Sequence, residues 1–367
     1  MSNKPIYFPG LNGLRTLAAL SVVVSHTTLA LSKFNLDANF FGTFRNGEPK
    51  GLAMAGFGVT IFFVLSGFLI TYLLVTEKKL QPISIKKFYM RRILRIWPLY
   101  YLYLSIAVIV ILCFGLELNI RSLFFYLFYA ANVPFILNST IPFIGHYWSL
   151  GVEEQFYLFW PWINKKVKNL IPVILALIII LVGTKILLHF LTPGSIFENA
   201  IQVTRFHCMM IGALGAIFYD NKNKLLLLLS DNKIAQAICW LVILLLIINK
   251  FHIASIIDHE IISLVTVVII IGQIKIKNRI VNLDTKVMDF LGKISYGIYV
   301  IHPVIIFLFA KLINQVNIAP PIKYFAVYTS IAALTIFFSW LSYTYFEKYF
   351  MTLKKKFEVV KSSAKRI

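Results

Sequence analysis

Residues 11–32 of the chain read LNGLRTLAALSVVVSHTTLALS, an apolar stretch long enough to cross a lipid bilayer as one helix. Two ionisable residues interrupt it, Arg15 near its start and His26 near its middle. They are about three helical turns apart, so both side chains project from one face, roughly 16 Å apart along the axis. Because a charge facing hydrocarbon is costly, we expect this face to point into a bundle or a watered cavity and to mark a working site.

The composition of the chain is that of an integral membrane protein. Hydrophobic residues make up 59% of the 367 residues, charged residues 14%, and the mean hydropathy is +0.79. Apolar runs long enough to cross ~30 Å of hydrocarbon as helices recur along the whole sequence. We therefore predict an all-α integral membrane protein, a bundle of about ten transmembrane helices at 14–32, 53–76, 93–115, 147–163, 170–191, 203–219, 234–248, 260–274, 290–312 and 324–346.

The net charge of +21 follows the loops between these spans. With the N-terminus inside, the inward loops and the C-terminal tail hold 25 of the 36 Lys and Arg residues. The outward loops hold only Lys33, Arg45, Lys50, Arg121, Lys250 and Lys323. This bias predicts a multi-pass protein of the cytoplasmic (inner) membrane with both termini cytoplasmic, and it argues against a nucleic-acid partner.

The predicted domain organisation is simple. Residues 1–350 form the membrane domain, 351–367 form a basic cytoplasmic tail, and no soluble domain is fused to them.

Residues 121–145 are apolar enough for an eleventh span, but counting them would place the lysines at 165–168 outside. Pro134 and Pro142 favour a broken element, so we predict a short helix and loop embedded at the outer side. The cysteines at 113, 208 and 239 have unrelated spacing and suggest neither a disulfide framework nor a metal site.

Arginines gather at residues 86–101, KKFYMRRILRIWPLYY. Arg92 and Arg95 share a helix face, with Arg91 adjacent, and two guanidinium groups on one face can hold phosphate oxygens bidentately. The alternative is that they anchor the helix and contact lipid headgroups. Arg95 favours the phosphate role because it lies a turn inside the apolar run.

Small residues mark the second span, GFGVTIFFVLSGFLITYLL at 56–74. Gly56, Gly58, Ser66 and Gly67 allow neighbouring backbones to approach closely, so this helix is expected at the centre of the bundle.

The fourth span opens with GHYWSLGVEEQFYLFWPW at 145–162, the most polar stretch of any span. Ser149 and Glu153 share a face, together with His146 and Tyr157. A carboxylate at this depth either pairs with a cation, such as Arg15 or Arg205, or serves in proton transfer. Trp148 and its aromatic neighbours fit an interfacial belt.

A further polar stripe lies in the ninth span, LGKISYGIYVIHPVII at 291–306. Ser295, Tyr299 and His302 share one face, and Pro303 frees a backbone carbonyl next to that histidine. A lone histidine on an apolar helix usually serves packing, but the polar residues on the same face favour a role of His302 in a site.

Six pieces of the sequence occur in one order: Arg15 with His26, SGFL at 66–69, RRILRIWP at 91–98, HYWSLGVEEQFY at 146–157, ISYGIYVIHP at 294–303 and YFEK at 345–348. Together they resemble the membrane acyltransferase-3 family of O-acyltransferases. The resemblance departs at Tyr349, where proline is common after the glutamate-lysine pair.

The resemblance implies transfer of an acyl group, commonly acetyl, from cytoplasmic acetyl-CoA to a hydroxyl of an extracytoplasmic glycan or glycolipid. It implies acyl-CoA as donor substrate, with no bound cofactor and no metal. Carried over by residue, it assigns His26, Arg15 and Glu153 to the reaction centre and Arg92 with Arg95 to the phosphates of the donor. From their positions in the sequence we add Arg91 to the donor site and predict a supporting polar core at Trp148, Ser149, Ser295, Tyr299 and His302.

Several alternatives stay open at this level. His26 fits a general base, but a covalent acyl relay through a side chain fits the sequence as well. The same polar residues could instead line the path of a transporter or flippase for a lipid-linked glycan or small anion, or the polar core of a sensor. The acceptor, the acyl group and the oligomeric state are not predicted.

Overall fold

The computed structural model describes residues 6–43, 49–316 and 318–360, so Lys4, Arg45 and the end of the predicted tail lie outside the described residues. Its α-helices are α1 Leu11–Leu29, α2 Met54–Leu80, α3 Ile85–Cys113, α4 Ile120–Leu127, α5 Asn132–Ile136, α6 Trp148–Lys166, α7 Leu170–Leu191, α8 Ile196–Thr204, α9 Phe206–Asp220, α10 Lys224–Asp231, α11 Lys233–Ile247, α12 Asp258–Lys275, α13 Lys286–Lys293, α14 Ser295–Ile313, α15 Pro320–Ser342 and α16 Lys348–Lys354. Short 3-10 turns lie at Leu31–Phe34, Asn39–Phe41, Gly145–Tyr147 and Lys355–Phe357, and a π-helical turn at Tyr343–Glu347 joins α15 to α16. The all-helical prediction is confirmed for these residues.

Each of the ten predicted spans overlaps a helix, and 170–191 coincides with α7. By length and hydropathy, six helical segments of the described chain qualify as membrane spans, or seven if the bent pair α10 and α11 counts as one. Helices α1, α6 and α12 fall outside this count, and they carry the residues that lower hydropathy: Arg15 and His26, Glu153 and Glu154, Asp258 and Glu260. The chain is an integral membrane protein, and its three most polar long helices are the ones that hydropathy alone does not identify as spans.

Helix ends account for the shifts from the predicted bounds. Helix α3 begins at Ile85 rather than 93, because the Ser84 side chain caps it by accepting the backbone N–H of Lys87. The predicted sixth span is broken before Phe206, where Arg205 adopts a left-handed conformation at φ 44° between α8 and α9. The predicted ninth span is divided at Ile294 between α13 and α14.

The broken element predicted at 121–145 is confirmed. Two short helices, α4 and α5, occupy this region together with the turn at Gly145–Tyr147, and none of them is long enough to cross a membrane. Pro134 lies within the five-residue α5, and Asn119 caps α4 by accepting the backbone N–H of Ser122.

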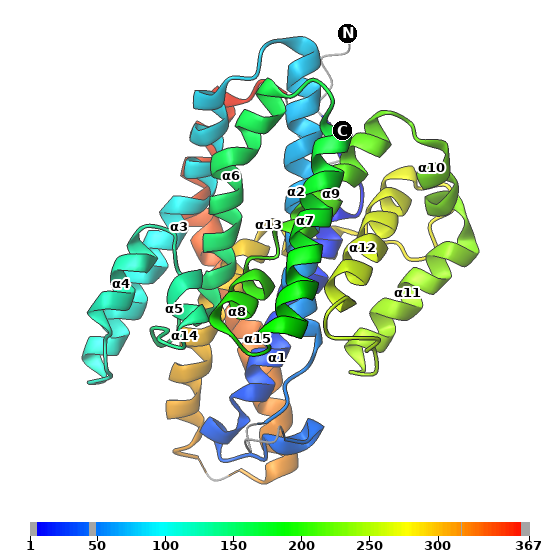
Figure 1. Cartoon of the computed structure of the whole chain (residues 1–367). Helices are drawn as coiled ribbons and strands as arrows, with labels where there is room; N and C mark the ends of the chain where they lie inside the picture. Colours follow the sequence, from blue (N-terminus) through cyan, green and yellow to red (C-terminus); the bar gives the residue numbers. More distant parts are fainter. Residues whose placement is uncertain (1–5, 44–48, 317, 361–367) are drawn as a thin grey trace.

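Helix α2 runs through the centre of the bundle, as its small residues predict (Figure 1). A Cβ on Gly67 would lie 1.9 Å from the Met209 carbonyl oxygen of α9, and one on Gly212 would lie 2.2 Å from the Val64 oxygen of α2. The two backbones therefore meet directly, and only glycine fits at either point of contact.

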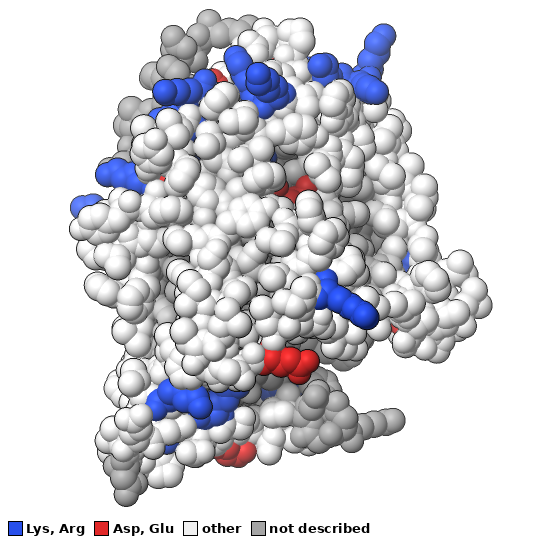
Figure 2. Space-filling model, turned by 90° about the vertical axis from the view of Figure 1, so that its left-hand side faces the viewer, with Lys and Arg blue, Asp and Glu red and all other residues white. Residues whose placement is uncertain are grey.

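On the face drawn in Figure 2, Lys and Arg gather at the upper end. The broad surface below is mostly uncharged, with a few charged side chains at mid-height and at the lower end. The first and last described stretches meet at one cavity, which residues 6–8 and 351–358 both line. Both described ends of the chain therefore lie on the same side of the bundle.

Candidate active site

A cavity of about 670 Å³ opens among α1, α2, α3, α6, α13 and α14 and is bordered by the segment 343–358. Among the described residues, its lining includes seven cationic side chains but only two carboxylates, Glu153 and Glu358. The cations are Arg15, Arg92, Arg95, Lys293, Lys348, Lys354 and Lys355. Such an excess of positive charge inside a bundle is costly unless an anion binds there.

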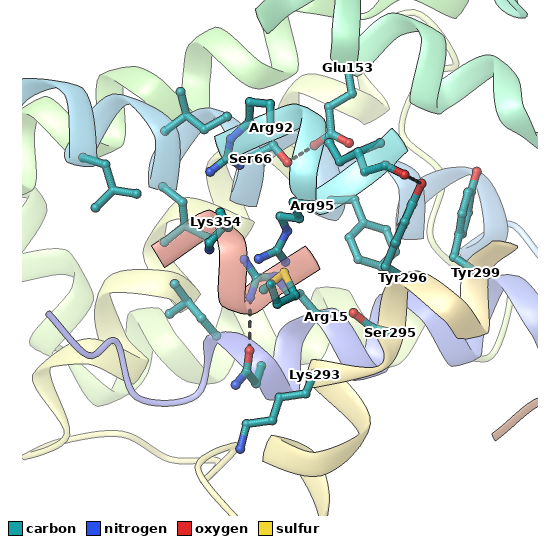
Figure 3. A pocket seen from close by; sticks show the side chains of 18 of the residues that line it. Arg15, Ser66, Arg92, Arg95, Glu153, Lys293, Ser295, Tyr296, Tyr299 and Lys354 are labelled. Carbon is teal, nitrogen blue, oxygen red and sulfur yellow. Dashed lines mark hydrogen bonds between the residues drawn. The ribbon is translucent and has the colours of Figure 1, made fainter. Parts of the chain in front are cut away.

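The arginines of the cavity keep much of their hydrogen-bonding capacity unused. Arg92 packs over the rings of Phe88 and Tyr157, 6.0 and 5.9 Å from their centroids, and its Nε has no partner among the described residues. Arg95 forms no hydrogen bond or ion pair within the described part of the chain. Arg15 donates only to the Asn12 side chain, at 3.1 Å. Figure 3 shows Arg15, Arg95 and Lys354 close together in the cavity.

Glu153 lies in the same cavity, but its partners are hydroxyls. Its Oε1 accepts hydrogen bonds from Ser66 and, at 2.5 Å, from Tyr157 (Figure 3). The sequence leaves two roles open for this carboxylate, and of these the ion pair with Arg15 or Arg205 is not formed among the described residues; both hydroxyl groups bind the same oxygen, Oε1. Arg205 instead lies over Trp148, 5.4 Å from the ring centroid.

At its deep end the cavity reaches Ser149 and Tyr299. The Ser149 and Tyr299 hydroxyls are 2.6 Å apart, and Tyr299 donates to the backbone oxygen of His146 at 3.0 Å. Tyr299 also lies beside the His146 ring, with 5.2 Å between ring centroids. Ser149 and Tyr299 therefore stand between the cationic cavity and a group of histidines.

This histidine cluster consists of His26 from α1, His146 before α6 and His302 from α14. Nδ1 of His26 lies 2.8 Å from Nε2 of His302, and the His146 ring centroid is 6.5 and 5.3 Å from theirs. His302 is fully buried, whereas His26 is only partly so. No group of three or more His, Cys, Asp or Glu in the described ranges has the arrangement of a metal site.

The hydrogen bonds of His302 determine the tautomers of neutral rings. Nδ1 of His302 lies 3.2 Å from the Ile298 carbonyl oxygen, which only accepts, so this nitrogen carries the proton. Nε2 of His302 is then an acceptor, and it accepts a hydrogen bond from the Nδ1–H of His26. The network leaves Nε2 of His26 with a free lone pair, which is the form that a general base requires.

Four predicted site residues are not part of the cavity lining: His26 and His302, which belong to the histidine cluster, and Arg91 and Trp148. Arg91 is not part of the lining: it pairs with Glu77 at 3.1 Å and donates to the Phe357 carbonyl oxygen at 2.8 Å. Trp148 stacks on Phe135 with 5.2 Å between ring centroids. By contrast, Arg15, Arg92, Arg95, Glu153, Ser149, Ser295 and Tyr299 all line the cavity.

Sequence reasoning missed several cavity residues. Lys293 and Tyr296 lie within the stretch 291–306 but outside its predicted polar face, and four more come from the C-terminal segment: Lys348, Lys354, Lys355 and Glu358. The sequence puts His146 on the same helix face as Ser149 and Glu153, but His146 is not among the predicted site residues, although the polar motif around it indicates a role in the site. The tail lysines had no such signal, since a basic segment after a last span is the usual cytoplasmic pattern.

A second charged cluster lies among α7, α9 and α12, outside the cavity. Lys185 binds both Glu260 oxygens, at 2.8 and 3.0 Å, and His207 Nε2 approaches the same carboxylate at 3.1 Å. Lys185 and His207 are 2 and 1% exposed. In this cluster the cationic groups converge on one carboxylate.

Comparison with known proteins identifies the family. The family described as "Acyltransferase domain" (acyltransferase-3) matches residues 8–344. The O-acetyltransferase OatA of Staphylococcus aureus is 26% identical over 94% of this chain, and a putative O-acetyltransferase of the same species is 27% identical over 94%. The peptidoglycan O-acetyltransferase OatA of Listeria monocytogenes is 35% identical over 42% of the chain, which is 24% of its own length.

The chain spans little more than half of the two staphylococcal relatives, 57% of each. No solved structure matches it. Since the family match covers most of the chain, the protein belongs to the acyltransferase-3 family of membrane proteins and is homologous to the OatA O-acetyltransferases.

Proposed function

We propose that the protein is an O-acyltransferase of the cytoplasmic membrane that moves an acyl group, acetyl in the first instance, from cytoplasmic acyl-CoA to a hydroxyl of an extracytoplasmic glycan. The cavity end bordered by 348–358 faces the cytoplasm in this proposal. The gathering of Lys and Arg at that end supports the orientation, since cytoplasmic loops carry the excess of positive charge (Figure 2).

The observation that carries the proposal is the cavity with seven cations against two carboxylates. Its volume falls within the usual ~300 to 1,000 Å³ of small-molecule sites. Coenzyme A carries three phosphate groups, and guanidinium groups with unused donors, such as those of Arg92 and Arg95, are suited to charge-assisted bonds with them. The thioester end would then extend toward Ser149 and Tyr299.

His26, in the histidine cluster beyond Ser149 and Tyr299, is the proposed general base. Its Nε2 accepts the proton of the acceptor hydroxyl while that oxygen attacks the thioester carbonyl carbon. The new ester C–O bond forms, the C–S bond breaks, and the proton passes from His26 to the departing thiolate. The hydrogen bond to His302 keeps His26 in the tautomer whose Nε2 can accept a proton. Arg15 and Glu153 line the cavity and interact electrostatically with the bound donor.

The proposed acceptor is a cell-envelope glycan, for which peptidoglycan is the first candidate. The support is the name of the Listeria relative, a peptidoglycan O-acetyltransferase. A glycolipid acceptor would use the same chemistry.

The test is acetyl transfer in proteoliposomes loaded with peptidoglycan fragments and supplied outside with radiolabelled acetyl-CoA. Protein inserted with the cavity end outward should label the enclosed fragments, and His26→Ala should not. Movement of the glycan across the membrane without any need for acetyl-CoA would overturn the proposal in favour of a transporter.

A further inference from the structure

The C-terminal segment 348–358, hereafter the C-terminal strap, forms one border of the cavity. Residues Lys348, Met351, Thr352, Lys354, Lys355 and Glu358 all line it. Figure 1 shows this red segment beside α3, and α16 and the turn after it pack on that helix. The described part of the predicted tail therefore packs on the membrane domain.

A buried ion pair fastens the strap. Arg91 of α3 donates from Nη1 to the Phe357 carbonyl oxygen at 2.8 Å and from Nη2 to Glu77 at 3.1 Å. Glu77 is 1% exposed, and its other oxygen accepts the backbone N–H of Ser84 at 2.9 Å. One guanidinium group thus joins α2, α3 and the strap, with each partner satisfied, so the position of the strap is specified.

The strap places one lysine ammonium group among the cavity arginines. Lys354 is 8% exposed and lies within electrostatic range of Arg92 and Arg95. Its one ion-pair partner in the described chain is Glu358, one turn later on the strap itself, at 3.5 Å. A buried lysine beside two arginines, with a single long contact to a carboxylate, has the surroundings of a group that binds an anion.

We propose that the strap completes the donor site, with Lys354 as a phosphate ligand beside Arg92 and Arg95 and with Glu358 in the place of the phosphate until the donor binds. This inference rests on the proposed function, since it names the residues that hold the donor. The Arg91–Glu77 pair acts as a positioning device, and it explains why Arg91 lies beside the site without lining it.

The experiment is titration of the purified full-length protein with coenzyme A in nanodiscs of zwitterionic lipid. Lys354→Met should raise Kd about tenfold, the cost of one charge-assisted hydrogen bond, whereas Glu358→Gln should lower Kd because the competing carboxylate is gone. Lys356→Met is the matched control: Lys356 is on the same strap but is exposed and outside the lining, so Kd should not change.

The positioning role has its own readout. Arg91→Met should also weaken coenzyme A binding, but it should add little to Lys354→Met, because both remove the same contact. Full additivity of the two substitutions would overturn the positioning role. Unchanged thermal unfolding of Lys354→Met would show that its loss of affinity is not a folding defect.

Other outcomes separate the possible failures. If Arg95→Gln weakens binding but Lys354→Met does not, the strap is no part of the site and the inference falls while the proposed function stands. If wild-type protein does not bind coenzyme A at all, the proposed function itself fails. If nanodiscs with anionic lipid abolish binding in wild-type protein and Lys354→Met alike, the cavity binds headgroup phosphate and the inference is overturned.

Discussion

The cavity site and the cluster of Lys185, Glu260 and His207 are both charged groups within a membrane protein, but they are built differently. In the cluster among α7, α9 and α12, Lys185 and His207 both lie within 3.1 Å of the Glu260 carboxylate. In the cavity, Arg95 has no partner among the described residues, Arg92 Nε has none, and Glu153 is bound by hydroxyls. Likewise, no described residue pairs with Nε2 of His26.

Pairing separates buried charges that hold the fold together from buried charges that serve a ligand. A buried charge with a satisfied partner holds helices together, and removing one partner harms the fold. A buried charge whose donors are unused has a cost that the fold does not offset, so a ligand is the natural explanation. The same reasoning moves Arg91 out of the donor site, because Glu77 and Phe357 satisfy it.

The largest effect is expected from His26→Ala. Removing the proposed base should lower acetyl transfer by roughly 100- to 10,000-fold while coenzyme A still binds. Single-turnover transfer from labelled acetyl-CoA measures this. His252→Ala is the control, since His252 is an exposed histidine far along the chain in the loop before α12, and it should keep normal transfer. Full activity of His26→Ala in folded protein would contradict the assignment.

The next effect concerns the tautomer of His26. His302→Leu removes the acceptor of its Nδ1 proton and should cost about 100-fold in kcat, with KM for the donor almost unchanged. His302→Gln can accept through its amide oxygen and should recover part of the rate. Equal loss in both variants would show that His302 serves packing alone.

A smaller effect on transfer is expected from Arg95→Gln. Loss of charge-assisted bonds to phosphate should raise KM for acetyl-CoA about tenfold and leave kcat nearly intact. Steady-state kinetics over a range of donor concentrations measure the split. A fall in kcat at constant KM would place Arg95 in the chemical step instead.

The smallest effect on transfer is expected from Glu260→Gln, in the paired cluster. It leaves buried Lys185 without its carboxylate, which should destabilise the fold by about 3 kcal/mol, but the folded fraction should transfer normally. Thermal unfolding in detergent and activity per folded molecule measure the two quantities. Combining Glu260→Leu with Lys185→Met should restore stability. A loss of transfer per folded molecule in Glu260→Gln would show that this cluster is not purely structural.

Local sequence patterns predicted much of the architecture. Apolar runs located a helix in each of the ten predicted ranges, the small residues of 56–74 placed α2 at the centre, and proline identified the broken segment after Arg121. Helix starts were less predictable, because a cap such as Ser84 lets α3 begin about two turns before the apolar run. The break at Arg205 depends on a single left-handed residue, which hydropathy does not detect.

The candidate site was predictable only where polar residues interrupt an apolar helix. Arg15, Arg95, Glu153 and Tyr299 stood out against hydrocarbon, and all four line one cavity. Lys354 did not stand out, because its burial arises from contacts between distant segments. Arg91 lies next to the helix face that Arg92 shares with Arg95, and only its partner Glu77 shows that its role differs from theirs.

The decisive measurement is an experimental structure of the full chain with coenzyme A bound. We expect phosphate groups among Arg92, Arg95 and Lys354, with the thiol end directed toward Ser149 and Tyr299. Coenzyme A bound outside the cavity, or bound within it with the thiol end among the arginines, would contradict the central claim that the unpaired cations hold the donor and deliver its acyl group to the histidine cluster.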